Sequence, residues 1–260
     1  MGRIENKLAE LKKARKKALV FFLTAGFPER DSTENIAESL ERGGADILEI
    51  GMPFSDPLAD GPVIQRSSQV ALKNGVTLDS IFTIVASIRL RSSIPLVLMG
   101  YLNPIMEYGP EKFFSTAAKT GVDGVILPEL PLEEVGRFKS MIESNGLSQI
   151  LLVTPTTAPG RIRRIDSASN GFLYCVSTTG VTGSGPRGDI KRYLEIVRHN
   201  APKNPLLVGF GIATPKDALA LSKEADGVIV GSALLKFLSS SDSAQSLQTW
   251  VGGFRTALNQ

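Results

Sequence analysis

Eight short apolar segments alternate along the chain with segments of helical periodicity, and this repetition restricts the possible folds more than any other feature. The apolar segments are nearly continuous hydrophobic runs, which is typical of parallel strands covered on both faces. We predict strands at Leu19–Thr24, Asp46–Ile50, Pro95–Gly100, Gly124–Leu127, Gln149–Thr154, Phe172–Ser177, Leu206–Gly209 and Gly227–Val230. We predict helices at Asp31–Arg42, Leu78–Leu90, Glu111–Lys119, Leu132–Glu143, Arg161–Ala168, Ile190–His199, Pro215–Glu224, Ala233–Leu238 and Leu247–Leu258.

Eight strand–helix units predict an α/β fold of one kind, the closed eight-stranded (β/α)8 TIM barrel. A chain of 260 residues has the usual length of such a barrel, so we expect residues 1–260 to form a single domain. Ile4, Leu8 and Leu11 keep helical spacing before the first strand and predict an extra N-terminal helix. An open doubly wound sheet is the alternative, which the lack of a GxGxxG motif after the first strand disfavours.

Composition limits where such a chain works and which ligands it can hold. No apolar run reaches the ~18 residues of a membrane span, and the N-terminus has no apolar segment with a cleavage site. The single cysteine, Cys175, cannot form an internal disulfide, so we expect a cytoplasmic protein, or a stromal one if the chain is a processed plastid form. The single histidine, His199, falls at the end of a predicted helix, where we expect it to be solvated. A metal site built on several His or Cys ligands is therefore excluded.

A basic run, KKARKK at Lys12–Lys17, carries much of the excess behind the formal charge of +3. Such a run can mark a nucleic-acid or membrane-binding surface. No aromatic cluster and no second basic patch accompanies it in the sequence, so we interpret it as the solvated face of the N-terminal helix. We expect neither nucleic acid nor a membrane as a partner.

A glutamate interrupts the second apolar segment, in the stretch ILEIGMPFSDPLADGP at Ile47–Pro62. Strand alternation puts Glu49 on the same face as Ile47, so its carboxyl group should be poorly hydrated and its pKa raised. Functional groups of (β/α)8 barrels lie at the carboxyl ends of the strands, which favours a general acid or base at Glu49. A structural glutamate paired with a buried partner is the alternative.

The loop that follows Glu49 is stiff, because three prolines fix its backbone, and it carries two aspartates. Asp60 can lie near the mouth of the barrel. Asp56 and Asp60 can equally cap turns, and spacing alone does not separate the two possibilities.

Two glycine-containing regions complete the predicted mouth. Residues Ser177–Asp189 (STTGVTGSGPRGD) form a long loop after the sixth strand, which predicts a lid, with a plain flexible insertion as the alternative. GFGI and VGSAL end the seventh and eighth strands, where barrels of this kind hold phosphate. Gly231 and Ser232 open a short helix whose free N–H groups attract an anion. The residues alone thus indicate a barrel that binds a small phosphate ester and transfers protons with carboxyl groups.

These segments resemble, from end to end, the alpha subunit of tryptophan synthase. The most specific similarity is LEIGMPFSDPLADGPVIQ at Leu48–Gln65. Supporting motifs occur in family order: FLTAGFP, GYLNPI, STTGVTG, GFGI and VIVGSAL. The resemblance implies a lyase that cleaves indole-3-glycerol phosphate to indole and glyceraldehyde 3-phosphate, without a cofactor of its own. It also implies a pyridoxal-phosphate beta subunit as partner, in an alpha2beta2 complex, which receives the indole through a tunnel.

The resemblance further implies roles for individual residues. Glu49 matches the catalytic acid–base, and Asp60 matches the residue that accepts the indole N–H. Residues that match the indole pocket or its vicinity are Phe22, Tyr101, Leu127, Tyr174 and Thr182. The matches to the phosphate site are Gly183, Gly211, Gly231 and Ser232, and those to the partner interface are Pro53, Asp56, Asn103 and Pro104.

Two other functions fit the same predicted barrel. One is a sugar-phosphate isomerase or epimerase, although a metal-dependent epimerase needs more histidines than the chain has. The other is a subunit that acts mainly as an allosteric partner and has little lyase activity itself.

Overall fold

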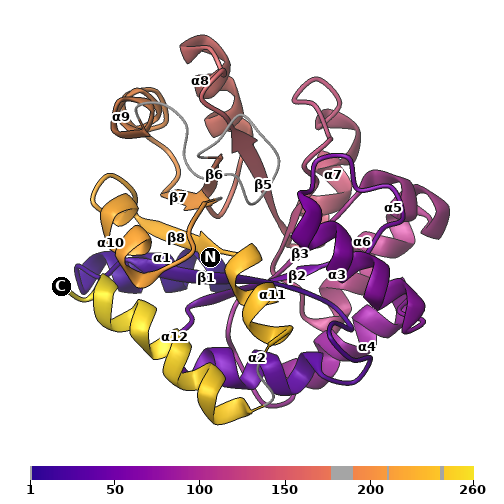
Figure 1. The fold of residues 1–260 in the computed structure, drawn as a ribbon. Coiled ribbons are helices and arrows are strands. Elements are labelled where there is room, and N and C mark those ends of the chain that lie inside the picture. Colours follow the sequence, from indigo (N-terminus) through magenta and orange to yellow (C-terminus); the bar gives the residue numbers. More distant parts are fainter. Residues whose placement is uncertain (1, 177–189, 210, 241–242) are drawn as a thin grey trace.

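The computed structural model describes residues 2–176, 190–209, 211–240 and 243–260. Its strands form a closed barrel in which all neighbours are parallel and β1 pairs with both β2 and β8 (Figure 1). The strands are β1 Ala18–Thr24, β2 Ile47–Gly51, β3 Leu96–Met99, β4 Gly124–Ile126, β5 Ser148–Val153, β6 Leu173–Val176, β7 Leu206–Gly209 and β8 Gly227–Val230. The predicted (β/α)8 barrel is confirmed, and the open sheet is wrong because β8 closes on β1.

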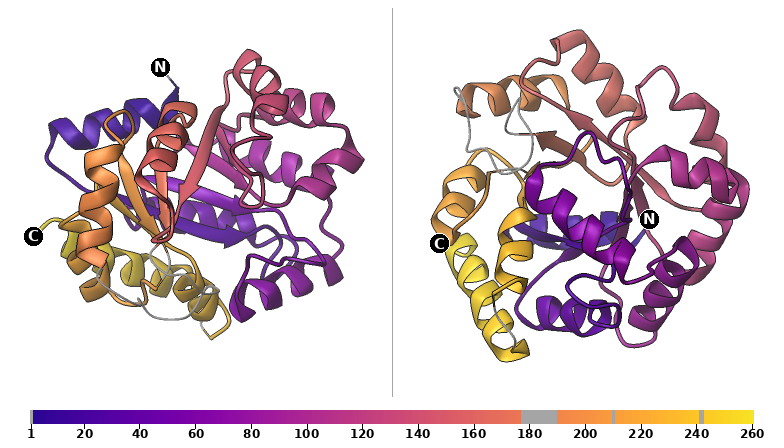
Figure 2. Two further views of the ribbon diagram at one scale, coloured as in Figure 1. Left: turned by 90° about the horizontal axis from the view of Figure 1, so that it is seen from above. Right: turned by 45° about the vertical axis from the view of Figure 1, so that its right-hand side comes forward.

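Helices surround the barrel on its outside (Figure 2). They are α1 Arg3–Lys13, α2 Thr33–Arg42, α3 Pro62–Lys73, α4 Leu78–Arg89, α5 Leu102–Tyr108, α6 Pro110–Thr120, α7 Gly136–Ser144, α8 Pro159–Ala168, α9 Ile190–Asn200, α10 Pro215–Ser222, α11 Ser232–Leu238 and α12 Ala244–Leu258. Among the described residues, no single helix has the length and apolar composition of a membrane span; α3 and α4 meet that test only as a pair bent by 98°.

Strand alternation divides the buried side chains into two clusters. Outward-facing residues such as Phe21 and Leu48 pack against the helices, whereas Val20 and Ile47 point into the barrel. The interior cluster also contains the three apolar residues of α1, Ile4, Leu8 and Leu11. The extra N-terminal helix is therefore confirmed: it closes the end of the barrel at which the strands begin (Figure 2).

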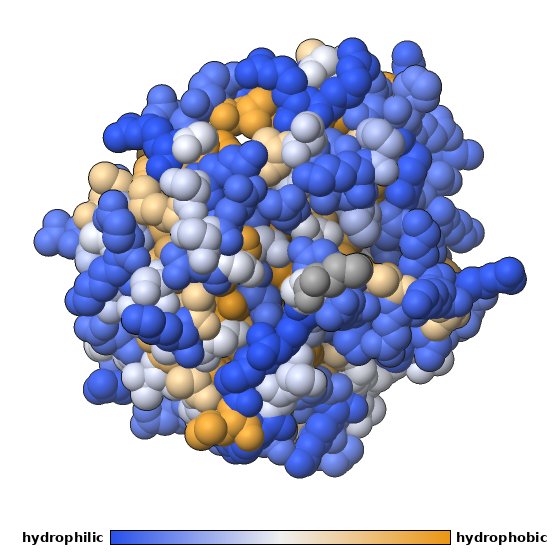
Figure 3. All heavy atoms as spheres, turned by 180° about the vertical axis from the view of Figure 1, so that it is seen from behind, coloured by the Kyte–Doolittle hydropathy of each residue, from blue (hydrophilic) through white to orange (hydrophobic). Residues whose placement is uncertain are grey.

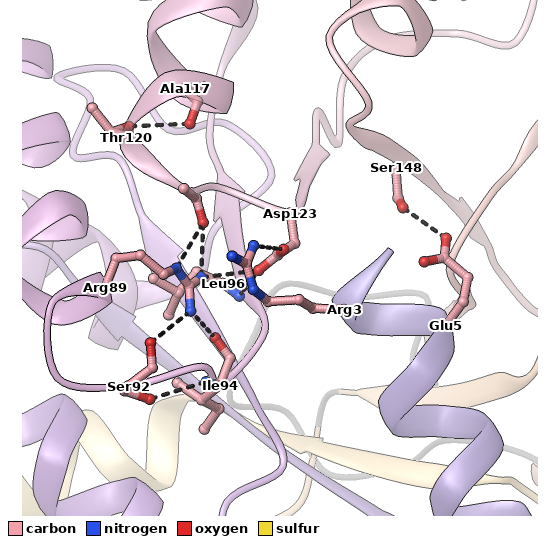
Figure 4. A network of polar contacts seen from close by, with 11 residues as sticks. Arg3, Glu5, Arg89, Ser92, Ile94, Leu96, Ala117, Thr120, Asp123 and Ser148 are labelled. Carbon is pink, nitrogen blue, oxygen red and sulfur yellow. Dashed lines mark hydrogen bonds and ion pairs between the residues drawn. The ribbon is translucent and has the colours of Figure 1, made fainter. Parts of the chain in front are cut away.

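A buried carboxylate ties α1 to the barrel. Asp123, just before β4, accepts hydrogen bonds from Arg3 (2.8 Å), from Arg89 (3.0 Å) and from the Leu96 backbone N–H (2.8 Å) (Figure 4). Arg89 in turn donates to backbone carbonyls around it, including that of Gly121. Removal of one member of such a buried network leaves the other charges without a partner.

We therefore expect Asp123→Ala to lower the free energy of unfolding by about 3 kcal/mol, measured by urea denaturation. The matched control is Glu134→Ala, which breaks the ion pair with Arg137 (3.1 Å) on the surface. The control should lower the free energy of unfolding by less than about 1 kcal/mol, because the side chains of Glu134 and Arg137 are both solvated. Equal losses in the two variants would contradict a structural role for Asp123.

Two helices, α3 and α5, were not predicted from the sequence, and the predicted start of a third was misplaced. In α3 the buried face contains Ser67 and Ser68, which weakens the apolar periodicity, and α5 has only seven residues. The predicted start of α7 at Leu132 is wrong: that helix begins at Gly136. Tight turns precede it, in which the Leu130 N–H bonds to Leu127 and the Glu134 N–H to Pro131.

Candidate functional site

Glu49 lies on β2 with its side chain buried inside the barrel. It pairs in register with Phe22 on β1 and with Val97 on β3, and it is two residues beyond Ile47 of the interior cluster. Neither of its carboxyl oxygens has a hydrogen-bond partner within the described part of the chain. The alternative of a structural glutamate held by a buried partner therefore receives no support from the described residues.

Burial has a direct effect on the proton affinity of Glu49. Loss of hydration disfavours the ionised form and raises the pKa from 4.5 to about 8. The group is thus mainly protonated at neutral pH, as a general acid requires. The Tyr174 side chain on β6 lies close enough for the Glu49 charge to act on it, and burial and this charge both raise the tyrosine pKa well above its ordinary value.

Asp60 ends the acidic loop and is fixed there by backbone contacts. Its N–H bonds to the Pro57 carbonyl (3.0 Å), and its own carbonyl accepts from the Gln65 side chain (2.9 Å). Gln65 belongs to α3, which is attached to the barrel through a 2.6 Å hydrogen bond between Ser67 and Thr24 of β1. The missed helix α3 is therefore the element that positions this aspartate.

Tyr101, at the end of β3, connects the loop to the barrel mouth. Its hydroxyl accepts the Ala59 N–H at 3.0 Å and is hydrogen-bonded to the Asp60 carboxyl group. Burial raises the Asp60 pKa from 3.8 to about 6, and the bond to Tyr101 works in the opposite direction. Asp60 is thus ionised at neutral pH, whereas Glu49 is not, and the two carboxyl groups suit different tasks.

We expect Tyr101→Phe to move the acid limb of the kcat/KM pH profile from about pH 6 to higher pH, by about one pH unit. The sign follows from the hydrogen bond, which stabilises the ionised Asp60 and so lowers its pKa. Activity that needs ionised Asp60 then appears only at higher pH.

The matched control for that variant is Tyr108→Phe, which removes a similar tyrosine–aspartate bond, to Asp79 (2.6 Å), on the surface. The control should leave the limb in place. An unshifted limb in Tyr101→Phe would show that this hydroxyl does not influence Asp60.

A cavity of about 550 Å³ opens at the carboxyl end of the barrel. Its wall contains six of the predicted site residues: Phe22, Asp60, Tyr174, Gly211, Gly231 and Ser232. A smaller neighbouring hollow is lined by Phe22, Asp60 and Tyr101. Glu49 is fully buried and is not among the residues that line either hollow.

The remaining predicted site residues are not all at the cavity. Leu127 lines neither hollow and packs in the cluster between the strands and the helices. Thr182 and Gly183, with the whole predicted lid at 177–189, lie outside the described residues.

The predicted partner residues lie on two neighbouring segments. Asp56 and Asn103 are exposed, Pro104 is partly exposed and Pro53 is buried. Leu58, 90% exposed, is an apolar residue on the same loop, and it was missed because exposure cannot be read from its type.

Sequence reasoning missed further cavity residues. Ile64, Met99 and Trp250 add apolar wall, and they carry no signal that separates them from core residues. Lys236 lines the cavity one helical turn after Ser232, on α11. Its spacing of four residues from Ser232 was the available signal.

The fold and the site define the class: a (β/α)8-barrel enzyme with two buried carboxyl groups, those of Glu49 and Asp60, at the carboxyl end of its strands. Within the described residues no group of three or more His, Cys, Asp or Glu side chains is arranged to hold a metal ion.

Comparison with known proteins identifies the family. The family model described as "Tryptophan synthase alpha chain" matches residues 8–254. The tryptophan synthase alpha chain of Citrifermentans bemidjiense is 47% identical, covering 100% of this chain and 97% of its own length, and that of Geobacter sulfurreducens is 45% identical with 99% of both covered. The crystal structure of tryptophan synthase subunit alpha from Legionella pneumophila superposes with a TM-score of 0.92 at 38% identity, over 100% and 99% of the two chains. A structure of Mycobacterium tuberculosis tryptophan synthase superposes with a TM-score of 0.92 at 31% sequence identity, again over 100% and 99% of the two chains.

The chain therefore belongs to the tryptophan synthase alpha chain family. It is a lyase of tryptophan biosynthesis that cleaves indole-3-glycerol phosphate, and the alternative isomerase or epimerase function is wrong. The similarity to tryptophan synthase structures implies a beta subunit as its partner.

Proposed function

We propose that Glu49 carries out the proton transfers of this cleavage and that ionised Asp60 holds the indole N–H. The observation that carries the proposal is the burial of both carboxyl groups at one barrel mouth, which raises the pKa of Glu49 to about 8 and that of Asp60 to about 6. Both values arise chiefly from burial, but among the described residues only Asp60 has a hydrogen bond that favours its charged form.

The reaction needs both forms. The bond from C3 of the indole breaks easily only after C3 is protonated, which gives a cationic indolenine. Glu49 delivers that proton and, once ionised, removes a proton from the glycerol hydroxyl as the carbon–carbon bond breaks. Ionised Asp60 accepts the indole N–H and stabilises the positive charge of the ring.

We propose one orientation of the substrate in the cavity. Phe22 and Tyr174 supply apolar wall next to Asp60, which suits the indole ring. Gly211, Gly231 and Ser232 lie together on the same wall and suit the phosphate, with backbone N–H groups of the α11 start as donors. In this proposal Thr182, Gly183 and the rest of the predicted lid at 177–189 complete the indole end and the phosphate end of the cavity. Leu127 lines neither hollow, and a contact of Leu127 with the indole stays a prediction.

The partner surface is proposed on the acidic loop and α5, and the assembly as an alpha2beta2 complex. Exposed Asp56 and Asn103 lie there together with two exposed apolar side chains, Leu58 and Met106. Because Tyr101 and Asp60 are bonded to the same loop, a partner that presses on it also acts on the site.

The function is tested by incubation of the purified chain with indole-3-glycerol phosphate and a coupled assay of glyceraldehyde 3-phosphate. We expect slow release by the chain alone and faster release with a beta subunit. No release under either condition would overturn the activity and favour the partner-only alternative. Binding of the beta subunit with no change in rate would overturn the proposed link between loop and site.

A further inference from the structure

The basic run at Lys12–Lys17 lies beside a second group of cations that comes from the other end of the chain. A cavity of about 420 Å³ is lined by six cationic residues and a single acidic one. The cations are Lys12, Arg15, Lys16, Lys17, Arg198 and Lys203, and the acid is Asp226. The fold thus supplies the second basic patch that the sequence lacks near the run.

This cavity is separate from the candidate active site. Its walls are the end of α1, the end of α9 with the turn that follows, and the start of β8, all at the end of the barrel where the strands begin. Figure 3 views this end of the molecule, and its surface is predominantly hydrophilic. The buried residues Leu8, Leu11 and Ala201 form the apolar floor of this cavity, and Pro202 and Pro205 add apolar lining.

Several of the cations are held in place, whereas others have free donors. Lys203 is fixed by the carbonyls of Ser167 and Ser169 and by the Asn170 side chain, at 2.9, 2.7 and 3.0 Å. Lys17 donates to the Ala225 carbonyl at 2.7 Å. These two contribute a fixed positive field at the cavity wall.

The only acidic residue in the wall is already neutralised. Asp226 pairs with Arg198 at 2.7 Å and accepts the Leu206 N–H at 2.7 Å. The side chains of Lys12, Arg15 and Lys16 form no ion pair or hydrogen bond with other described residues. The net field of the cavity is therefore positive, and three cations can contact an anion directly.

The turn that presents these cations is strained in a way that glycine would relieve. Helix α1 ends in a Schellman motif, with the Lys16 N–H on the Leu11 carbonyl (2.9 Å) and the Arg15 N–H on Lys12 (3.1 Å). The residue at the left-handed position is usually glycine, but here it is Arg15, with φ of 57°. A cation therefore stands where the backbone alone favours glycine.

We propose that this cavity binds a small molecule that carries a polyphosphate chain. Several adjacent cations match several adjacent anionic groups, and arginine holds phosphate oxygens through two parallel hydrogen bonds. The volume suits a ligand of nucleotide size, and the apolar floor can take a flat ring next to the phosphates.

The test is calorimetric titration of the full chain with inorganic triphosphate and with ATP, at low and at physiological salt. We expect one site per chain, with affinity that falls as salt rises. The triple variant Lys12→Ala, Arg15→Ala, Lys16→Ala should weaken binding at least tenfold. The control, Lys112→Ala with Lys119→Ala on α6, removes exposed cations far from the cavity and should not change it.

The two probes separate the sources of the polyphosphate. Tighter binding of ATP than of triphosphate identifies a nucleotide, with its base on the apolar floor, and equal binding identifies the phosphate chain alone. Failure of both probes to bind would overturn the proposal, as would equal weakening in the control or unchanged affinity in the triple variant. Binding of a single-stranded oligonucleotide but of neither probe would overturn it in favour of a nucleic-acid surface.

A second variant tests the role of Arg15 when the triple variant is unstable. Arg15→Gly should raise the Tm, because glycine adopts positive φ without strain, and should weaken triphosphate binding at least threefold. A raised Tm with unchanged triphosphate binding would show that Arg15 does not contact the ligand. Its left-handed backbone would then have no connection with binding.

Discussion

Glu49→Gln is expected to lower kcat for indole-3-glycerol phosphate cleavage about 1,000-fold, with the substrate still bound. Glutamine matches the protonated carboxyl group in size and polarity but cannot give up a proton. The fully buried site, with no partner for either oxygen among the described residues, accommodates the amide without a change in charge. Single-turnover cleavage and equilibrium binding of a substrate analogue measure the two effects separately.

The pH dependence of the free energy of unfolding serves as the control for Glu49→Gln. The folded-state pKa of Glu49, about 8, lies above the ordinary 4.5, so the folded chain binds more protons than the unfolded chain between these values. The free energy of unfolding of the wild type therefore falls as pH rises from about 4.5 to 8, by at most about 5 kcal/mol from this group. Glu49→Gln should lack this part of the pH dependence. Retained turnover in a folded variant would remove Glu49 from the acid–base role.

Asp60→Asn is expected to lower kcat by a factor of about 100 to 1,000. The amide keeps the shape of the side chain but not the negative charge that stabilises the protonated indole ring. Because charge develops on the ring during the reaction, kcat should fall more than substrate affinity does. Steady-state kinetics with indole-3-glycerol phosphate measure both.

The matched control is Asp56→Asn on the same loop. Asp56 is exposed, and its side chain is hydrogen-bonded only to the neighbouring Ser55 among the described residues. The Asp56→Asn variant should change kcat of the isolated chain less than twofold. If Asp56→Asn reduced the rate as much as Asp60→Asn, the loop as a whole would be responsible, and the specific role of Asp60 would be lost.

The position of Glu49 could be predicted from the periodicity of its strand. A strand has a period of two, so Ile47 and Glu49 fall on one face wherever that strand lies in the fold. The raised pKa follows from burial of that face alone. The position of Asp60 does not follow in this way, because its loop has no period. Its environment depends on Tyr101, 41 positions away by their numbers, and on the attachment of α3 to β1.

The sequence by itself determined the eight-unit barrel, the extra N-terminal helix and the inward direction of Glu49, because these depend on spacing between near neighbours. Only the tertiary structure decided that Tyr101 holds Asp60, that Lys236 and Ser232 share a wall with Tyr174, and that the basic run meets Arg198 and Lys203. The physical reason is barrel closure: pairing of β1 with β8 brings residues far apart in the chain to the same end of one barrel, and no local pattern records which of them meet.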